Sequence, residues 1–164
     1  MNPNRITLEP LTKENLPHLR QIHREDVSEA FVDSADTLME LTEYGIQHHC
    51  LGKSYAVKYA QAYIGLLLLG EALPWDTDPE EMRGVPFYRL MGFVLDSRCR
   101  GQGIGNAVLD MAIADCFRSF GPRPIALGCH KDNRRAADFY LRRGFSPRPA
   151  MDGEDQYYLW YPES

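Results

Sequence analysis

The sequence predicts a single domain of the α/β (α+β) class, in which a mixed, mostly antiparallel central sheet is flanked by about four helices. The chain of 164 residues has the length of one domain with a sizeable core. Its composition, 44% hydrophobic and 25% charged, is ordinary for a globular protein. Strand-like and helix-like segments alternate in the order βααβββαβαβ without an internal repeat, which favours one mixed sheet with helices packed on it.

The first half of the chain predicts a strand, two helices and a hairpin. Thr12 is placed to cap a helix in which Leu16, Leu19 and Ile22 follow helical spacing. The expected elements are a strand over 5–11, helices over 12–26 and 34–49, strands over 54–60 and 63–72 joined by a turn at 61–62, and a loop over 73–86.

The second half predicts strands that alternate with two helices. The mostly apolar FYRLMGFVLD is typical of a strand covered on both faces. Asp132 or Asn133 can cap the last helix, and Gly144 can end it. The expected elements are a strand over 87–96, a helix from the glycine-rich stretch to about residue 120, a strand over 124–130, a helix over 132–145 and a strand over 155–161.

Several simple features limit where the protein is expected to be located and which partners it is expected to bind. The start of the chain has no basic segment followed by an apolar one, so we expect no signal peptide. No apolar run approaches the roughly 20 residues of a membrane helix. The four cysteines lack CxxC spacing, which favours reduced thiols and a cytoplasmic location. A pI near 5.5 argues against general nucleic-acid binding.

The net charge of −5 is unevenly distributed along the chain. Residues 1–93 carry 8 basic and 14 acidic side chains, residues 94–143 carry 9 and 5, and the rest carry 1 and 4. A basic middle in an acidic protein fits an anionic ligand held centrally and cations attracted elsewhere. A chance excess on solvated faces gives the same counts.

The stretch DSRCRGQGIGNAVLDMAI, residues 96–113, places glycines at alternate positions between an apolar strand and a helix. Glycines there allow positive φ and close approach of a ligand to the backbone. The helix start offers unpaired N–H groups and the positive end of the helix dipole, which suit a phosphate or pyrophosphate. A P-loop is excluded, because Gly105 is followed by Asn106 and Ala107, and the dinucleotide fingerprint lacks its last glycine.

The spacing R-x-x-G-x-G, formed by Arg100, Gly103 and Gly105, resembles the pyrophosphate-binding motif of the GCN5-related N-acetyltransferases (GNAT). The later NRRAADFYLRRGF, which begins at Asn133, is similar to the family's second signature, N-x-x-A-x-x-F-Y-x-x-x-G-F. The resemblance covers nearly the whole chain and is most specific over 88–145. It implies a fold with a splayed strand pair and transfer of an acetyl group from acetyl-CoA to an amine by direct attack, without a metal.

The resemblance also implies the roles of individual residues. Tyr140 would protonate the leaving thiolate, since a phenol remains a donor at neutral pH. A backbone N–H near Val94 or Leu95 would act as an oxyanion hole. Arg142 or Arg143 would reach the 3′-phosphate of CoA, or would only cap the helix end. The residues expected to bind acetyl-CoA are Phe93, Val94, Leu95, Arg100, Gly101, Gln102, Gly103, Ile104, Gly105, Asn106, Asn133 and Arg143.

The general base is harder to place. An alkylammonium with a pKa of ~10 is roughly 0.1% neutral at pH 7, so some group must accept its proton. Some relatives carry a carboxylate on the strand before the glycines, but FYRLMGFVL has no acid before Asp96. Glu71, at the end of the preceding strand, is the candidate; a water chain or an acid from the 76–81 loop is the alternative.

The acceptor side is expected to include Phe31, Trp75 and Asp76. Acidic and aromatic walls suit a polycation, and these stretches, with MDGEDQYY near the end, resemble bacterial spermine/spermidine acetyltransferases. The small-molecule amine is therefore expected to be a polyamine. A protein N-terminus, a lysine or an aminoglycoside remains an alternative acceptor, and a homodimer remains open.

Each feature also has an interpretation without catalysis. The glycines can form a ligand-free turn, Tyr140 can be a core residue and Asn133 a helix cap. Cys129 lies in an apolar strand and is interpreted as core rather than as a nucleophile. A non-catalytic domain that binds acyl-CoA and a structural α/β interaction domain are the corresponding alternatives for the whole chain.

Overall fold

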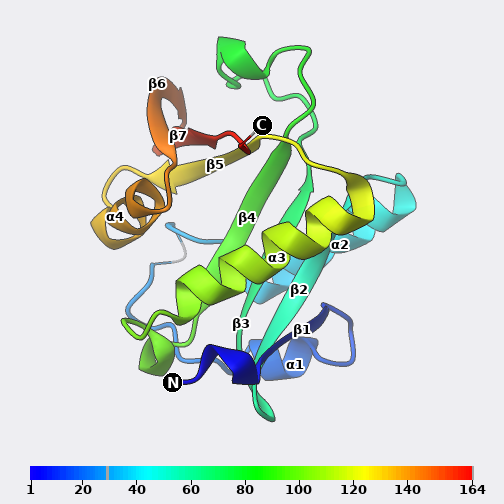
Figure 1. Ribbon diagram of the computed structural model, residues 1–164, viewed down its shortest axis with the longest axis vertical. Helices are drawn as coiled ribbons and strands as arrows, with labels where there is room; N and C mark the ends of the chain where they lie inside the picture. Colours follow the sequence, from blue (N-terminus) through cyan, green and yellow to red (C-terminus); the bar gives the residue numbers. More distant parts are fainter. Residues whose placement is uncertain (29, 164) are drawn as a thin grey trace.

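A seven-stranded sheet runs through the molecule in the order β1-β2-β3-β4-β5-β7-β6 (Figure 1). The computed structural model describes residues 1–28 and 30–163. Neighbouring strands are antiparallel except for β4 and β5, which confirms the mixed, mostly antiparallel sheet. The strands are β1 (Ile6–Pro10), β2 (Gly52–Tyr59), β3 (Ala62–Glu71), β4 (Tyr88–Leu95), β5 (Ile125–His130), β6 (Ser146–Asp152) and β7 (Asp155–Trp160).

Helices cover both faces of this sheet. In the order of the chain they are α1 (Leu16–Leu19), α2 (Ala35–Gln47), α3 (Ile104–Phe120) and α4 (Arg134–Arg142), with 3₁₀ turns η1 (Pro3–Arg5), η2 (Glu80–Met82) and η3 (Ser97–Cys99). Helices α1 and α2 pack on one face, and α3 and α4 pack on the other, with α3 crossing the front of the sheet in Figure 1. None of the helices among the described residues combines the length and the apolar character needed to cross a membrane.

The alternation of side chains along the central strands builds a core on each face. Tyr55 and Val57 of β2 contribute to the core under α3, and Ala56 between them contributes to the core under α2. In β3, Leu67 contributes to the core under α3 and Leu66 to the core under α2. Since both faces are buried, these strands can be apolar at every position.

Strands β4 and β5 pair only at their first residues and then diverge. Their parallel register contains two Cα pairs, Tyr88 with Ile125 and Arg89 with Ala126. Between Met91 and Val94 a bulge shifts the register of β4 against β3, and Gly92 there has a φ of +65°. A bulge bends its strand and increases the local twist. The splayed pair that the sequence led us to expect is therefore present.

Three details differ from the sequence prediction. Thr12 and Asn15 exchange hydrogen bonds, with Thr12 N–H donating to Asn15 Oδ1 and Asn15 N–H to Thr12 Oγ1. The helix nevertheless begins only at Leu16, with Asn15 rather than Thr12 as its N-cap, and it ends at Leu19 rather than near residue 26. Tertiary contacts are the reason: the N–H of His23 donates to the Asp96 carboxylate at 3.0 Å, and its carbonyl accepts from Ser97 N–H at 2.6 Å.

Strand β6 was not expected, because Pro147 and Pro149 interrupt it. It is the last strand of the sheet and pairs only with β7, a position where missing N–H donors are tolerated. The hairpin turn also lies one residue earlier than predicted, at 60–61, since β3 begins at Ala62.

Candidate active site

A cavity of about 270 Å³ lies where β4 and β5 diverge. Its walls come from the segment before α2, from the loop after β3, from β4 and β5, from α4 and its N-cap, and from β6 and β7. Five residues that the sequence singled out meet in this cavity although they are far apart in the chain; they are Phe31, Trp75, Phe93, Asn133 and Tyr140. The splay of the sheet is thus what creates the site.

Tyr140 is 8% exposed and lines the cavity from α4. Its ring packs edge-on against Phe139 and Phe145, which fixes its direction. Among residues 1–28 and 30–163, no group forms a hydrogen bond with its hydroxyl. The packing leaves the hydroxyl open to the cavity. Burial, followed by the nearby Cys129, raises the pKa of the phenol well above its ordinary value. The group therefore remains protonated at neutral pH and can donate a proton.

Asn133 is the N-cap of α4, as one of the two sequence interpretations proposed. Its Oδ1 accepts from Ala136 N–H at 3.3 Å. Its amide NH₂ has no partner in the part of the chain that the structure describes, and the residue lines the cavity. Capping therefore uses the oxygen of the side chain and leaves two donors for a ligand.

The backbone of β4 forms the wall between the cavity and β3. Val94 and Leu95 pair with Leu66 and Gly65 of β3, while their side chains are buried. On the β5 side the ladder stops after Arg89, so the following residues of β4 have no neighbouring strand on that edge within the described part of the chain. An extended ligand can take the place of the missing strand there.

The glycine-rich turn at the start of α3 presents free backbone donors. Gly101 and Gly103 have φ values of +74° and +77°, and a Cβ at either position would have no atom within 4 Å. Among the described residues, none accepts a hydrogen bond from the N–H groups of Gly101 to Asn106. Ile104, in contrast, is fully buried, and Gly105 lies close to the Phe139 ring. The turn therefore has the geometry of an anion site at a helix N-terminus.

The cations near this turn already have partners within the protein. Arg100 binds the Asp26 carboxylate and donates to Leu95 O at 2.7 Å, and Arg135 reaches the same Asp26 at 3.1 Å. Side-chain hydrogen bonds from the two arginines hold the pKa of Asp26 below its ordinary value against the effect of burial. Arg100 thus holds the turn against the end of β4 rather than extending freely into solvent.

The two arginines at the end of α4 differ. Arg143 donates to Asp110 Oδ1 of α3 at 2.5 Å, and its Nε is buried without a hydrogen-bond partner among the described residues. Arg142 is exposed. The structure therefore uses Arg143 to connect α4 to α3, and Arg142 is the one whose side chain extends into solvent.

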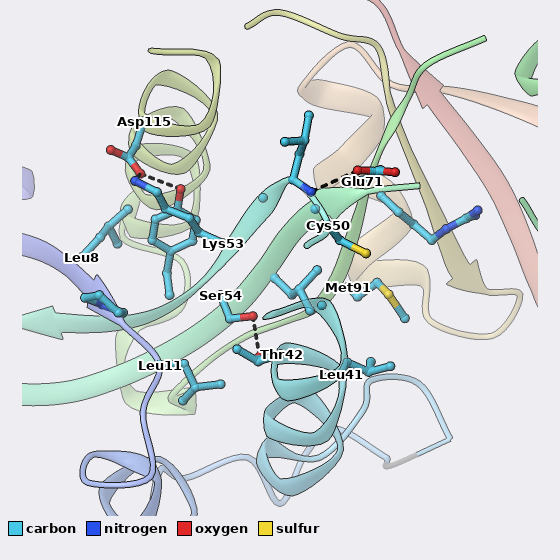
Figure 2. A pocket seen from close by; sticks show the side chains of 18 of the residues that line it. Leu8, Leu11, Leu41, Thr42, Cys50, Lys53, Ser54, Glu71, Met91 and Asp115 are labelled. Carbon is cyan, nitrogen blue, oxygen red and sulfur yellow. Dashed lines mark hydrogen bonds and ion pairs between the residues drawn. The ribbon is translucent and has the colours of Figure 1, made fainter. Parts of the chain in front are cut away.

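Glu71 does not lie at this cavity. It lines a second, larger cavity of about 1100 Å³ at the edge of the sheet, and its carboxylate accepts from Leu51 N–H at 3.0 Å (Figure 2). The second cavity also contains Asp115, which accepts hydrogen bonds from Lys53 and Tyr55. The sequence placed Glu71 correctly at the end of β3 but could not show towards which cavity it points.

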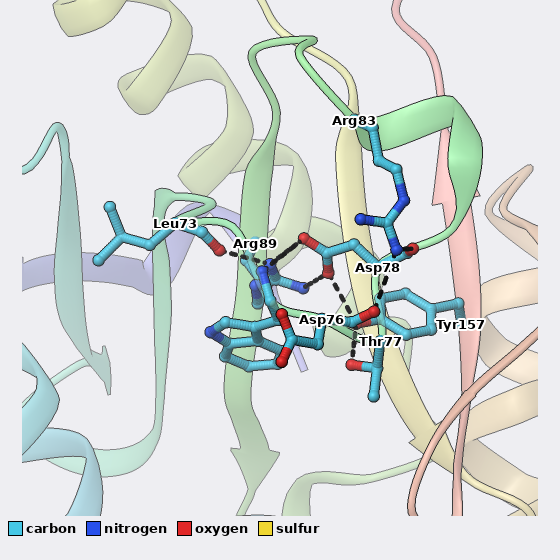
Figure 3. A network of polar contacts seen from close by, with 8 residues as sticks. Leu73, Asp76, Thr77, Asp78, Arg83, Arg89 and Tyr157 are labelled. Atoms are coloured by element: carbon cyan, nitrogen blue, oxygen red, sulfur yellow. Dashed lines mark hydrogen bonds and ion pairs between the residues drawn. The ribbon is translucent and has the colours of Figure 1, made fainter.

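Trp75 lines both cavities and is held by a buried ion pair. The Arg89 guanidinium lies 3.7 Å from the centroid of the indole ring and forms an ion pair with Asp78 at 3.1 Å (Figure 3). Tyr157 donates to the same carboxylate at 2.7 Å. Asp76, in contrast, is exposed and lines neither cavity; its carbonyl accepts from Arg83.

Three carboxylates line the first cavity although the sequence analysis did not single them out individually. They are Asp33, Asp152 and Asp155. Asp33 comes from the segment before α2, and the other two belong to β6 and β7. The signal available in the sequence was the acidic content of the two segments that contain them. Among the described residues no group of three or more His, Cys, Asp or Glu side chains has an arrangement that could hold a metal ion.

Cys129 also lines this cavity, but its thiol donates weakly to carbonyl oxygens of His130 and Asn133 at 3.8 and 3.7 Å. Burial raises the pKa of this thiol to about 11. A thiol that is protonated and turned towards the backbone fits the interpretation as a core residue.

The model of the Acetyltransferase (GNAT) family matches residues 16–145. A search of curated proteins found no match.

Many solved structures share the fold. PaiA N-acetyltransferase from Thermoplasma acidophilum, in complex with coenzyme A, is 17% identical with a TM-score of 0.70, covering 96% of this chain and 99% of that one. Spermidine N-acetyltransferase from Vibrio cholerae, in complex with CoA and spermine, is 18% identical with a TM-score of 0.65, covering 95% and 94%. Naa50 from Arabidopsis thaliana, in complex with the bisubstrate analogue CoA-Ac-MVNAL, is 16% identical with a TM-score of 0.64, covering 94% and 97%.

Proposed function

The chain belongs to the acetyltransferase (GNAT) family, and from this premise we propose that it transfers the acetyl group of acetyl-CoA to a primary amine by direct attack in a ternary complex. The observation that carries the proposal is the position of the unpartnered Tyr140 hydroxyl in the cavity between β4 and β5. Acetyl-CoA supplies the activated acyl group as a thioester. The residues of the chain bind it, orient the amine and move the protons.

The glycine-rich turn fits the pyrophosphate of CoA. Its N–H groups from Gly101 to Asn106 are free among the described residues, and the space beside Gly101 and Gly103 is open. Hydrogen bonds to a charged group stabilise by about 1.5–3 kcal/mol each. The turn leads to the free edge of β4, which can pair with the pantetheine arm, and the amide of Asn133 can donate to it.

The chemistry at the thioester divides between β4 and α4. A backbone N–H of β4 near Val94 or Leu95 would polarise the thioester carbonyl, a contribution of about 3 kcal/mol for an oxyanion-hole donor. Tyr140 would protonate the thiolate that leaves, since its raised pKa keeps the proton on the phenol at neutral pH.

The acceptor is proposed to be a polyamine. Asp33, Asp152 and Asp155 give the cavity a negative wall, and Phe31 and Trp75 add aromatic faces on which an ammonium group can rest. The fold is shared both with a protein solved with spermine and with one solved with a peptide-based analogue. The three carboxylates favour a cation with more than one charge over a peptide N-terminus.

The test is an assay of free-thiol release from acetyl-CoA with a panel of spermidine, spermine, a peptide N-terminus, a lysine peptide and an aminoglycoside. We expect release with the polyamines at a kcat/KM at least ten-fold above that of the others, falling as ionic strength screens the acidic wall. Binding of acetyl-CoA by calorimetry without thiol release for any amine would make the chain a CoA-binding domain instead. Release only with a peptide would keep the transferase and exclude the polyamine.

A further inference from the structure

The reaction proposed above needs a group that takes a proton from the acceptor ammonium. Strand β4 has no carboxylate before Asp96, and Asp96 is itself buried and bound to Arg98 and to backbone N–H groups. Glu71 faces the second cavity. A carboxylate that serves as the base at the first cavity therefore has to come from another element.

Asp155, the first residue of β7, reaches the cavity across the neighbouring strand. It is opposite His130 in the register of β5 and β7. Its carboxylate extends over Gly128 of β5: a Cβ at Gly128 would lie 3.2 Å from the Asp155 Cβ and 3.5 Å from its Oδ2. Since Gly128 has no side chain, the Asp155 side chain can lie against it, and both residues line the cavity.

The Asp155 carboxylate also accepts no hydrogen bond from the described residues. Asp78, Asp96 and Asp115 all accept hydrogen bonds from arginine, lysine or tyrosine side chains. Among the described residues nothing donates to the Asp155 carboxylate, although it lines a cavity.

Burial raises the pKa of Asp155, and Asp152, Asp33 and Glu154 add to this, while His130 acts in the opposite direction. A base whose pKa is closer to neutrality holds a proton more readily in the transition state.

We propose that Asp155 is the general base for the acceptor amine. One N–H bond of the bound ammonium breaks as the proton moves to the Asp155 carboxylate. The neutral nitrogen then attacks the carbonyl carbon, so that an N–C bond forms and the C–S bond breaks. The thiolate takes its proton from Tyr140, and the second proton that the acetylated nitrogen loses restores the phenol, so that the net proton released is the one held by Asp155. This inference rests on the proposed function, because it assigns a role within the same cavity.

His130 is the nearest competing base, and its environment is different. Its Nδ1 accepts from Asp132 N–H at 3.1 Å, and its ring lies against Phe31 with the centroids 4.6 Å apart. The ring supports the wall that Phe31 forms, and His130 is not among the residues that line the cavity. It is therefore a neighbour that tunes Asp155 rather than the proton acceptor.

The test is the pH dependence of kcat/KM for spermidine in Asp155→Asn against wild type. With a carboxylate base, kcat/KM of the wild type stays level between the pKa of the base and that of the amine. Without the base, only the neutral amine reacts, so kcat/KM of Asp155→Asn should rise about ten-fold per pH unit towards the pKa of the amine. The loss at pH 7 is expected to be about 10²-fold or more.

Two further measurements separate this role from a structural one. Calorimetry should give the same Kd for acetyl-CoA in Asp155→Asn as in wild type, and carbon NMR of the apo protein should show a pKa of the Asp155 carboxyl above the ordinary value of an aspartate. Asp152→Asn, the matched variant on the same wall, should raise KM for spermidine and keep the level pH profile.

A level profile in Asp155→Asn, or a ten-fold slope in Asp152→Asn as well, would overturn the assignment of Asp155. Absence of thiol release from the wild type with every amine would instead overturn the proposed function and this inference with it. Gly128→Ala should displace the carboxylate and reproduce part of the loss, and an unchanged kcat/KM there would also contradict the inference.

Discussion

At the scale of single residues, one side chain can serve both packing and chemistry. Tyr140 is buried against Phe139 and Phe145, as a core tyrosine would be, yet its hydroxyl meets the cavity without a protein partner among the described residues. The packing fixes the ring, and the ring presents the phenol. The two interpretations that the sequence left open for this residue are therefore compatible.

We predict that Tyr140→Phe lowers kcat by roughly 10²-fold, because it removes the proton donor and keeps the ring that packs the core. The Kd for acetyl-CoA should stay nearly unchanged, and so should the thermal midpoint. Steady-state kinetics and calorimetry measure the two effects. Equal losses of CoA affinity and of rate would indicate a packing role only.

The type of a residue alone does not predict its binding partner, as two arginines show. Arg100 and Arg143 were expected at the phosphates of CoA, and the structure pairs them with Asp26 and Asp110. These contacts hold the turn to the end of β4 and α4 to α3. Their charge still contributes to the positive field of the segment over 94–143, but their direct contact with phosphate remains a prediction.

At the scale of elements, the start of α3 concentrates the features of an anion site. The two positive-φ glycines curve the backbone, and the helix that follows aligns its dipole with the free N–H groups. The sequence was sufficient to predict this turn, because only glycine adopts such φ values without strain.

We predict that Gly103→Val raises KM for acetyl-CoA by on the order of ten-fold or more, equivalent to about 1.4 kcal/mol of lost binding. A β-branched residue is strained at φ +77°, and its side chain would enter the open space above the turn. Kinetics at saturating amine measure the change.

Gly121→Val is the matched control, since Gly121 has a φ of +98° at the other end of α3 and is equally open. It should lower stability without changing KM for acetyl-CoA. An unchanged KM in Gly103→Val would exclude the turn as the pyrophosphate site.

At the scale of the whole molecule, the splay between β4 and β5 requires another link between the two halves of the sheet. The loop after β3 provides it through Arg89 of β4, Asp78 of the loop and Tyr157 of β7. Arg89 and Asp78 are 5% and 8% exposed. The same pair holds Trp75 at the border of both cavities.

We predict that Arg89→Met lowers the free energy of unfolding by about 3–5 kcal/mol, the typical cost of leaving one member of a buried ion pair without its partner. Urea denaturation at pH 7 measures the loss. Arg118→Met, which removes an exposed ion pair with Asp115, should cost much less. Similar losses for the two variants would contradict the role of the buried pair.

The ion pair of Arg89 and Asp78 should make the free energy of unfolding depend on pH. Burial alone would raise the pKa of Asp78, but hydrogen bonds from Arg89, Trp75 N–H and Tyr157 hold it below its ordinary value of 3.8. A carboxylate with a lowered pKa stabilises the fold fully above the pKa of the unfolded chain. That contribution should disappear as pH falls below 3.8, and Arg89→Met should show a weaker fall of stability over the same range.

The amino-acid sequence alone was enough to predict the order of the elements other than β6, the mixed sheet, the glycine-rich turn and the family signature, because these depend on local spacing and on backbone preferences of neighbouring residues. The sequence-based prediction was wrong where a group far away in the chain binds the backbone. At His23 the backbone N–H donates to the Asp96 carboxylate, and the first helix has already ended. The three-dimensional fold was needed to show which charges are paired inside the protein, which cavity Glu71 faces, and that Asp155 lies against Gly128 at the first cavity. Direction and partner of a side chain are set by contacts between segments far apart in the chain, and no local pattern records them.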